Sequence, residues 1–176
     1  MDRTMLAVAA VPFVLSTLPA YAVPFSASLS GFEAVGALNN NTGAILTDGQ
    51  GSLQLDLDAA TQTVTYTLTY SGLSSNVTQA HVHFGKEHVA GGIMAFLCTN
   101  LGNGPAGTPA CPPAGGTVSG TITPASIVAI PGQNVAAGDF DAIVRAITSN
   151  TAYGNVHSVR FPAGEIRGQV TVGKGH

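Results

Sequence analysis

Two histidines that lie two residues apart carry the clearest chemical signal in this 176-residue sequence. His81 and His83 occupy the stretch AHVHFG, where apolar and polar residues alternate as in a half-buried β-strand. Side chains at this spacing leave the same face of a strand, so both imidazoles can converge on one ion, and imidazole suits zinc and copper. His157, in the predicted strand NVHSVRF, can supply a third ligand if the strands are neighbours. The histidines thus predict a copper or zinc site.

A second interpretation of the same residues stays open. The apolar residues of AHVHFG occupy the opposite face of the strand, and if that face is the core, His81 and His83 simply face water. His88 is a further possible ligand, but it follows in a predicted loop. The sequence contains no G-x-S-x-G, G-x-x-x-x-G-K or H-E-x-x-H motif, so we assign no catalytic residue and expect a binding module rather than an enzyme.

A charged cluster accompanies the histidines. Glu165 and Arg167 alternate with apolar residues in GEIRGQV and share a predicted face, where an arginine fork can pair with a carboxylate. We favour a polar network that fixes strand register. The alternative is that these side chains hydrogen-bond to a metal-binding histidine and orient it. Glu33, in LSGFEAVGAL, is either the partner of Arg167 or an exposed residue.

The elements that position these residues are predicted to be strands. GSLQLDLD and TVTYTLTY alternate strictly and form a predicted hairpin, and a second hairpin is expected around residues 162–164. One short helix is expected near residues 139–149, with apolar residues at helical spacing and Asp139 as the N-cap. The expected fold is all-β, an antiparallel β-sandwich or small barrel with this one helix.

The N-terminus resembles a secretory signal peptide. Arg3 precedes an apolar run over residues 5–18, and an A-x-A pattern ends at Ala22. We expect cleavage after Ala22, a mature domain of residues 23–176 in the periplasm or outside the cell, and no transmembrane span after cleavage. Cys98 and Cys111 are the only cysteines, and in an exported protein they predict one disulfide. Charged residues make up 9% and the formal net charge is −3 without a basic run, so nucleic acid is not an expected partner.

Three blocks of the sequence resemble the CHRD domain, a module named after chordin. They are LSGFEAVGAL, YTLTYSGLSSNVTQAHVHFG and YGNVHSVRFPAGEIRGQV, and the resemblance runs from about residue 26 to residue 172. It implies an immunoglobulin-like or barrel-like all-β fold but little about activity. The positions that match the family's pattern are His81, His83, His157, Glu33, Glu165 and Arg167. The chain departs from the pattern at AVGAL, where an apolar-Pro-Pro segment is usual, and at Ser158, where threonine is usual.

A fainter similarity links HVHFG to the copper-binding H-V-H strand of the copper/zinc superoxide dismutases, but the rest of that pattern is missing. The first hypothesis is therefore an exported, non-enzymatic CHRD-domain module with a histidine site for copper or zinc. The second is a metal-free interaction or matrix module with a protein or polysaccharide partner. The third is a copper-dependent redox protein of the superoxide dismutase kind.

Overall fold

The computed structural model describes residues 22–36 and 43–173. The predicted signal peptide lies outside these residues, apart from Ala22. Within them the chain forms nine β-strands, one α-helix and three short 3-10 helices. The strands are β1 (Val23–Ser30), β2 (Gln50–Asp58), β3 (Thr63–Ser71), β4 (Val77–Phe84), β5 (Gly92–Thr99), β6 (Gly116–Ile122), β7 (Ala152–Ser158), β8 (Ile166–Gln169) and β9 (Thr171–Val172). The helices are α1 (Phe140–Thr148), η1 (Gly31–Glu33), η2 (Pro124–Ser126) and η3 (Pro131–Gln133).

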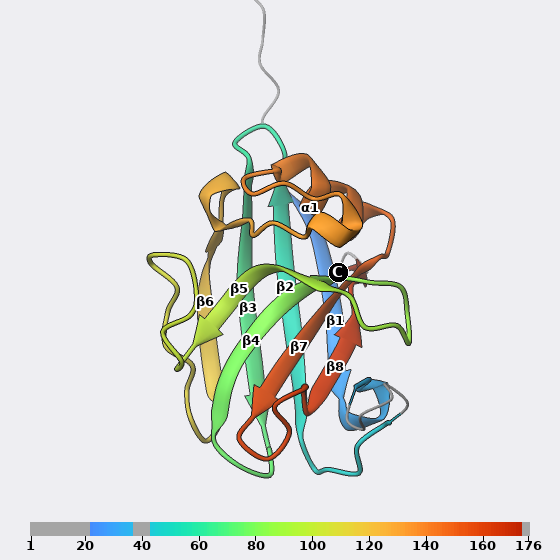
Figure 1. The fold of residues 1–176 in the computed structure, drawn as a ribbon, viewed down its shortest axis with the longest axis vertical. Helices are drawn as coiled ribbons and strands as arrows, with labels where there is room; N and C mark the ends of the chain where they lie inside the picture. The colour runs from blue at the N-terminus through green and yellow to red at the C-terminus, as the bar shows by residue number, and fades with distance from the viewer. Residues whose placement is uncertain (1–21, 37–42, 174–176) are drawn as a thin grey trace, which may run out of the picture.

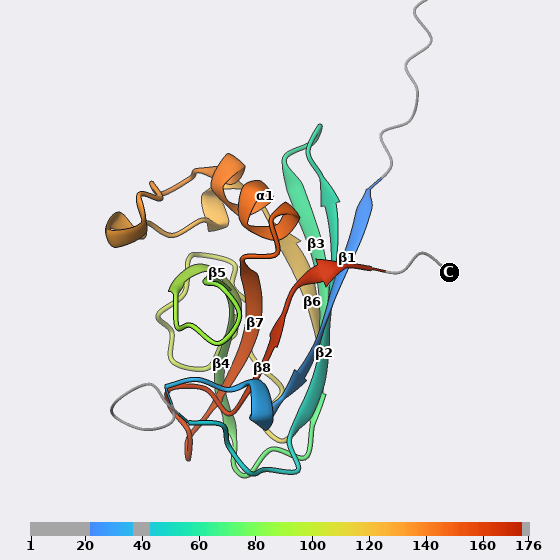
Figure 2. The same ribbon diagram turned by 90° about the vertical axis from the view of Figure 1, so that its right-hand side faces the viewer.

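The strands form one antiparallel sheet that curls into a nearly closed barrel. Their order is β5-β4-β7-β8-β1-β2-β3-β6, and β9 pairs with β1 beside β8. Figure 2 shows the two walls that result, with β4, β5 and β7 in one and β2, β3 and β6 in the other. This arrangement confirms the predicted all-β antiparallel fold and is the barrel rather than the sandwich of the two expected forms.

The interior of the barrel follows from the alternation of the sequence. β2 and β3 form the predicted hairpin, with Leu55 opposite Tyr66. Every second residue of both strands is buried, and the threonines between them face outward. The inward residues of this hairpin are Leu53, Leu55, Leu57, Val64, Tyr66, Leu68 and Tyr70. Burial of such side chains stabilises the fold by about 1.5–3 kcal/mol each for the aliphatic ones.

The two end strands of the sheet, β5 and β6, meet along a seam that side chains close. The Tyr66 hydroxyl donates to the Leu97 carbonyl of β5 at 2.6 Å. Cys98 of β5 is bonded to Cys111, which precedes β6 in the chain, so the predicted disulfide is present. These contacts occupy the edge of a sheet that would otherwise present unpaired backbone groups.

Helix α1 lies across one end of the barrel (Figure 1). It begins and ends inside the predicted range of residues 139–149. The Asp139 carboxylate accepts from the Ala142 amide at 3.0 Å, as an N-cap does. Ile143 and Ile147 are fully buried, so the helix closes the core at this end.

The hairpin of β7 and β8 lies beside β4 and carries the third histidine of the candidate site, His157. Its turn spans residues 159–165, and Asn155 of β7 lies opposite Arg167 of β8. Gly164 adopts a φ of 115°, and a Cβ there would meet the Asn155 amide group. Only glycine fits this backbone conformation without strain, so this turn is tightly specified.

Candidate metal centre

The three histidines come together on the outer face of the barrel wall. β4 pairs with β7, which places His81 opposite Asn155 and His83 opposite Tyr153. His157 is two residues beyond Asn155 on the same strand, so its imidazole leaves the same face. The intervening residues Ala80 and Val82 are part of the hydrophobic core on the other side of the wall. The sequence expectation that the strands are neighbours is therefore met.

This outer face is covered rather than open to water. His81, His83 and His157 expose only 0%, 7% and 6% of their surface. Backbone from two loops lies against the rings: Gly91, at the end of the loop after β4, contacts His83, and Pro162, in the β7–β8 turn, contacts His157. The interpretation in which the histidines face water is wrong, because the loops that follow β4 and β7 fold back over the outer face.

The hydrogen bonds of the rings fix their tautomers. His83 Nδ1 donates to the Gly91 carbonyl and His157 Nδ1 donates to the Pro162 carbonyl, both at 2.9 Å. A carbonyl only accepts, so each ring carries its proton on Nδ1 and keeps a lone pair on Nε2. His81 Nδ1 lies 3.1 Å from His157 Nε2 and therefore donates to it. All three rings are thus held in defined neutral states.

Several acceptor atoms at this cluster are buried without a partner. His81 Nε2, His83 Nε2 and Asn155 Oδ1 have no hydrogen-bond partner among the residues that the structure describes. A buried polar atom left unsatisfied costs about 1–3 kcal/mol. Lone pairs of this kind fit the requirements of a metal ligand, which must present an unprotonated nitrogen.

The surroundings keep the imidazoles uncharged. Burial, helped by the neighbouring His157 and His83, lowers the pKa of His81 from 6.5 to about 2. Burial lowers the pKa of His83 to about 4, against the opposing effect of its hydrogen bond to Gly91. Burial also lowers the pKa of His157. At neutral pH the cluster therefore offers three neutral imidazoles, which is the form that binds zinc or copper.

The ring nitrogens lie close to the spacing that one shared ion requires. One nitrogen from each histidine lies within 4.8 Å of the others. With metal–nitrogen distances of 2.0–2.1 Å, the ligands of a tetrahedral site are about 3.4 Å apart. The His81–His157 contact, at 3.1 Å, is close to that spacing. An ion between these rings would replace their hydrogen bond, and the His81 proton would move from Nδ1 to Nε2. Three histidines leave a fourth position for water or a further ligand.

Tyr153 supports the cluster, and the sequence analysis missed it. Its ring is stacked on His83 with centroids 4.7 Å apart and planes 5° from parallel. The Arg167 guanidinium lies 3.9 Å from the other side of the tyrosine ring, in a cation–π contact. Tyr153 precedes His157 by four residues on a strand and so shares its face. The alternation YGNVH could have indicated it.

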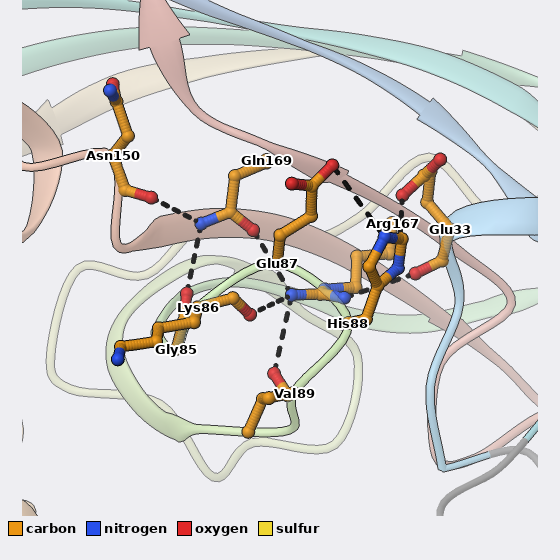
Figure 3. A network of polar contacts seen from close by, with 9 residues as sticks. All are labelled: Glu33, Gly85, Lys86, Glu87, His88, Val89, Asn150, Arg167 and Gln169. Carbon is orange, nitrogen blue, oxygen red and sulfur yellow. Dashed lines mark hydrogen bonds and ion pairs between the residues drawn. The ribbon is translucent and has the colours of Figure 1, made fainter.

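Arg167 holds the loop over this stack (Figure 3). The guanidinium is buried and donates to the carbonyls of Lys86 and Glu33, at 2.9 and 3.3 Å. It also donates to the Val89 carbonyl and the Gln169 side chain. Burial lowers the pKa of Arg167. The arginine thus ties the loop of residues 85–91 to the barrel wall through backbone oxygens.

Glu165 belongs to a separate network, so the predicted pairing with Arg167 is not found. Its carboxylate accepts from the Thr47 hydroxyl at 2.6 Å, the Ser158 hydroxyl at 2.5 Å, and both the amide and hydroxyl of Ser74. Burial raises the pKa of Glu165, but these donors outweigh it and hold the pKa below its ordinary value. The carboxylate binds three segments together and fixes the turn that carries Pro162.

Glu33 and His88 lie outside the histidine cluster. The backbone carbonyl of Glu33, rather than its carboxylate, accepts from Arg167. Its carboxylate lies 3.9 Å from His88 Nδ1, and Glu87 lies 3.8 Å from the other ring nitrogen. His88 is mostly exposed and belongs to this acidic group. The structure therefore does not bring it to the other three histidines.

The fold and the site define an all-β barrel with a covered histidine cluster on one wall. The chain belongs to the CHRD domain family, because the family model for the CHRD domain matches residues 25–170. No curated protein and no solved structure matches the chain. Among residues 22–36 and 43–173, the structure contains no helix long and apolar enough to cross a membrane.

Proposed function

We propose that this protein is an exported, non-enzymatic CHRD-domain module that binds one copper or zinc ion through His81, His83 and His157. The observation that carries the proposal is the convergence of three buried, neutral imidazoles, two of which have an unpartnered Nε2. Apolar side chains could pack under the covering loops equally well, whereas buried imidazole nitrogens without a partner cost free energy. The ion would be stored, buffered or used to hold the β4–β7 wall and its loops together.

Two features support a site outside the cytoplasm. The apolar run and A-x-A pattern of residues 1–22 are typical of a signal peptide. The Cys98–Cys111 disulfide suits an oxidising compartment.

The test is metal content measured by elemental mass spectrometry on protein purified without a histidine tag from medium containing both metals. We expect about one equivalent in the wild type and loss of the metal in His157→Gln. His88→Gln is the matched control, since it removes a histidine outside the cluster, and it should retain the metal. Cobalt substitution should give the visible absorption bands of a tetrahedral site.

Two outcomes would contradict the proposal. Wild-type protein without stoichiometric metal would favour a metal-free module whose partner is a protein or polysaccharide. Rapid superoxide turnover by the copper-loaded protein would show an enzyme instead of a binding module. Circular dichroism of His157→Gln separates lost ligation from lost folding.

A further inference from the structure

A cavity lies beside the loop that covers the histidines. It has a volume of about 430 Å³, within the range of small-molecule sites. Its walls come from the end of β4, the loop of residues 85–91, η3 and the C-terminal half of α1. The apolar part of the lining includes Phe84, Val89, Ala90 and Ala146. Val89 is 53% exposed, so part of its side chain is accessible to a ligand.

The walls of this cavity are held in place before any ligand arrives. Gln133 donates to the Phe84 carbonyl at 2.8 Å and accepts from the Gly92 amide at 2.7 Å. Gly85 donates to the Thr151 carbonyl at 2.8 Å. On the inner side of the loop, the carbonyls of Lys86 and Val89 accept from Arg167, while the side chains of both residues line the cavity. A preformed wall lowers the entropic cost of binding.

Two cations mark the mouth of the cavity. Lys86 and Arg145 line it, and they are two of the four lysine and arginine residues that the structure describes. Neither has a carboxylate partner within 4.0 Å among the described residues, whose ion pairs involve His88. Figure 3 shows the Lys86 amine pointing away from the carboxylates of Glu87 and Glu33. Both charges are therefore available to an anion in a protein of net charge −3.

We propose that this cavity binds a small organic monocarboxylate with an aromatic or short aliphatic body. The apolar walls would cover the body, and Lys86 and Arg145 would pair with the carboxylate at the mouth. None of the three clustered histidines lines this cavity, so the inference goes beyond the proposed metal site and does not depend on it.

The test is a titration of the ¹⁵N-labelled protein with phenylacetate and with its neutral analogue phenylacetamide, followed by NMR. We expect saturable shifts of amides in residues 84–90 and 145–151, with phenylacetate bound about tenfold more tightly than the amide. In Lys86→Gln/Arg145→Gln this preference should disappear. Arg160→Gln, a change of an arginine outside the cavity, should leave it intact.

A cavity-filling variant gives an independent readout. Ala90 is exposed at the rim, so Ala90→Trp should fold normally and abolish binding of both compounds. Equal affinity for the two compounds, shifts outside the cavity, or retained phenylacetate preference in the double variant would each overturn the proposal. So would the absence of saturable shifts in the wild type at millimolar concentrations.

Discussion

At the scale of single residues, the histidine cluster depends on the absence of charge. No carboxylate hydrogen-bonds to His81, His83 or His157 within the described part of the chain, and the only partners of their Nδ1 atoms are carbonyls and another imidazole. Burial then makes the protonated form costly, and each ring stays neutral. The unfolded chain has no such restriction, because its histidines titrate near pH 6.5.

This difference predicts that the protein loses stability in mild acid. The folded-state pKa of His81 and His83, about 2 and about 4, lies below the unfolded value, so the unfolded state binds more protons below pH 6.5. Their contribution is fully present above pH 6.5 and is lost as the pH falls toward the folded-state pKa. We expect a loss of roughly 2 kcal/mol per histidine in the free energy of unfolding between pH 7 and pH 5.

Urea unfolding of metal-free protein at several pH values measures this loss. The free energy of unfolding of His83→Gln should depend less steeply on pH than that of the wild type. The difference in slope should correspond to about one proton bound on unfolding. His88→Gln, which changes an exposed ring, should have the wild-type dependence. A stability that is constant from pH 7 to pH 5 would show that the rings are accessible to protons in the folded protein.

At the scale of elements, the loop of residues 85–91 depends on one arginine. Arg167 donates to the carbonyls of Lys86, Val89 and Glu33, and its guanidinium also stacks on Tyr153. The planar guanidinium group has several N–H donors and reaches all of these acceptors at once. A lysine ammonium is a single point charge and cannot reproduce this set of contacts.

We therefore expect Arg167→Lys to lower the free energy of unfolding by about 3 kcal/mol and to loosen the loop. Amide hydrogen exchange in residues 85–91 should accelerate more than exchange in β2 and β3. Arg160→Lys is the matched control, because Arg160 is exposed, and it should change stability by less than about 0.5 kcal/mol. Unchanged exchange in Arg167→Lys would mean that the loop is held by other contacts.

The sequence predicted the elements well and their side-chain partners less well. Alternation correctly assigned the strands around His81 and His157 and the face that each imidazole leaves. Alternation failed to predict the partners of Glu165. This residue precedes β8 and lies in the turn, where side chains no longer alternate between the two faces of a strand. Alternation also could not show that residues 85–91 and 159–165 cover the outer face, since that contact depends on tertiary structure.

At the scale of the whole molecule, the barrel is closed by side-chain contacts along a seam rather than by backbone pairing between its end strands. β5 and β6 stand at the two ends of the strand order. The Cys98–Cys111 disulfide and the Tyr66–Leu97 hydrogen bond lie at this seam. Composition and alternation predicted an all-β sandwich or barrel, but the strand order required long-range pairings that no local pattern encodes.

We expect Cys98→Ala/Cys111→Ala to lower the free energy of unfolding by about 3 kcal/mol, because the disulfide restricts a loop in the unfolded chain. Denaturant unfolding in oxidising buffer measures the difference. Added reductant should destabilise the wild type toward the variant and leave the variant unchanged. A double variant as stable as the oxidised wild type would show that the remaining seam contacts suffice.

The placement of the histidines on the outer side of the β4–β7 wall has a consequence for evolution and design. Ala80 and Val82 serve the hydrocarbon interior, while His81 and His83, one residue away, serve the exterior cluster. Selection can therefore change the side chains of the outer face without repacking the barrel. The wall is a scaffold on which an engineer could exchange the three imidazoles for other side chains and retain the same folded chain.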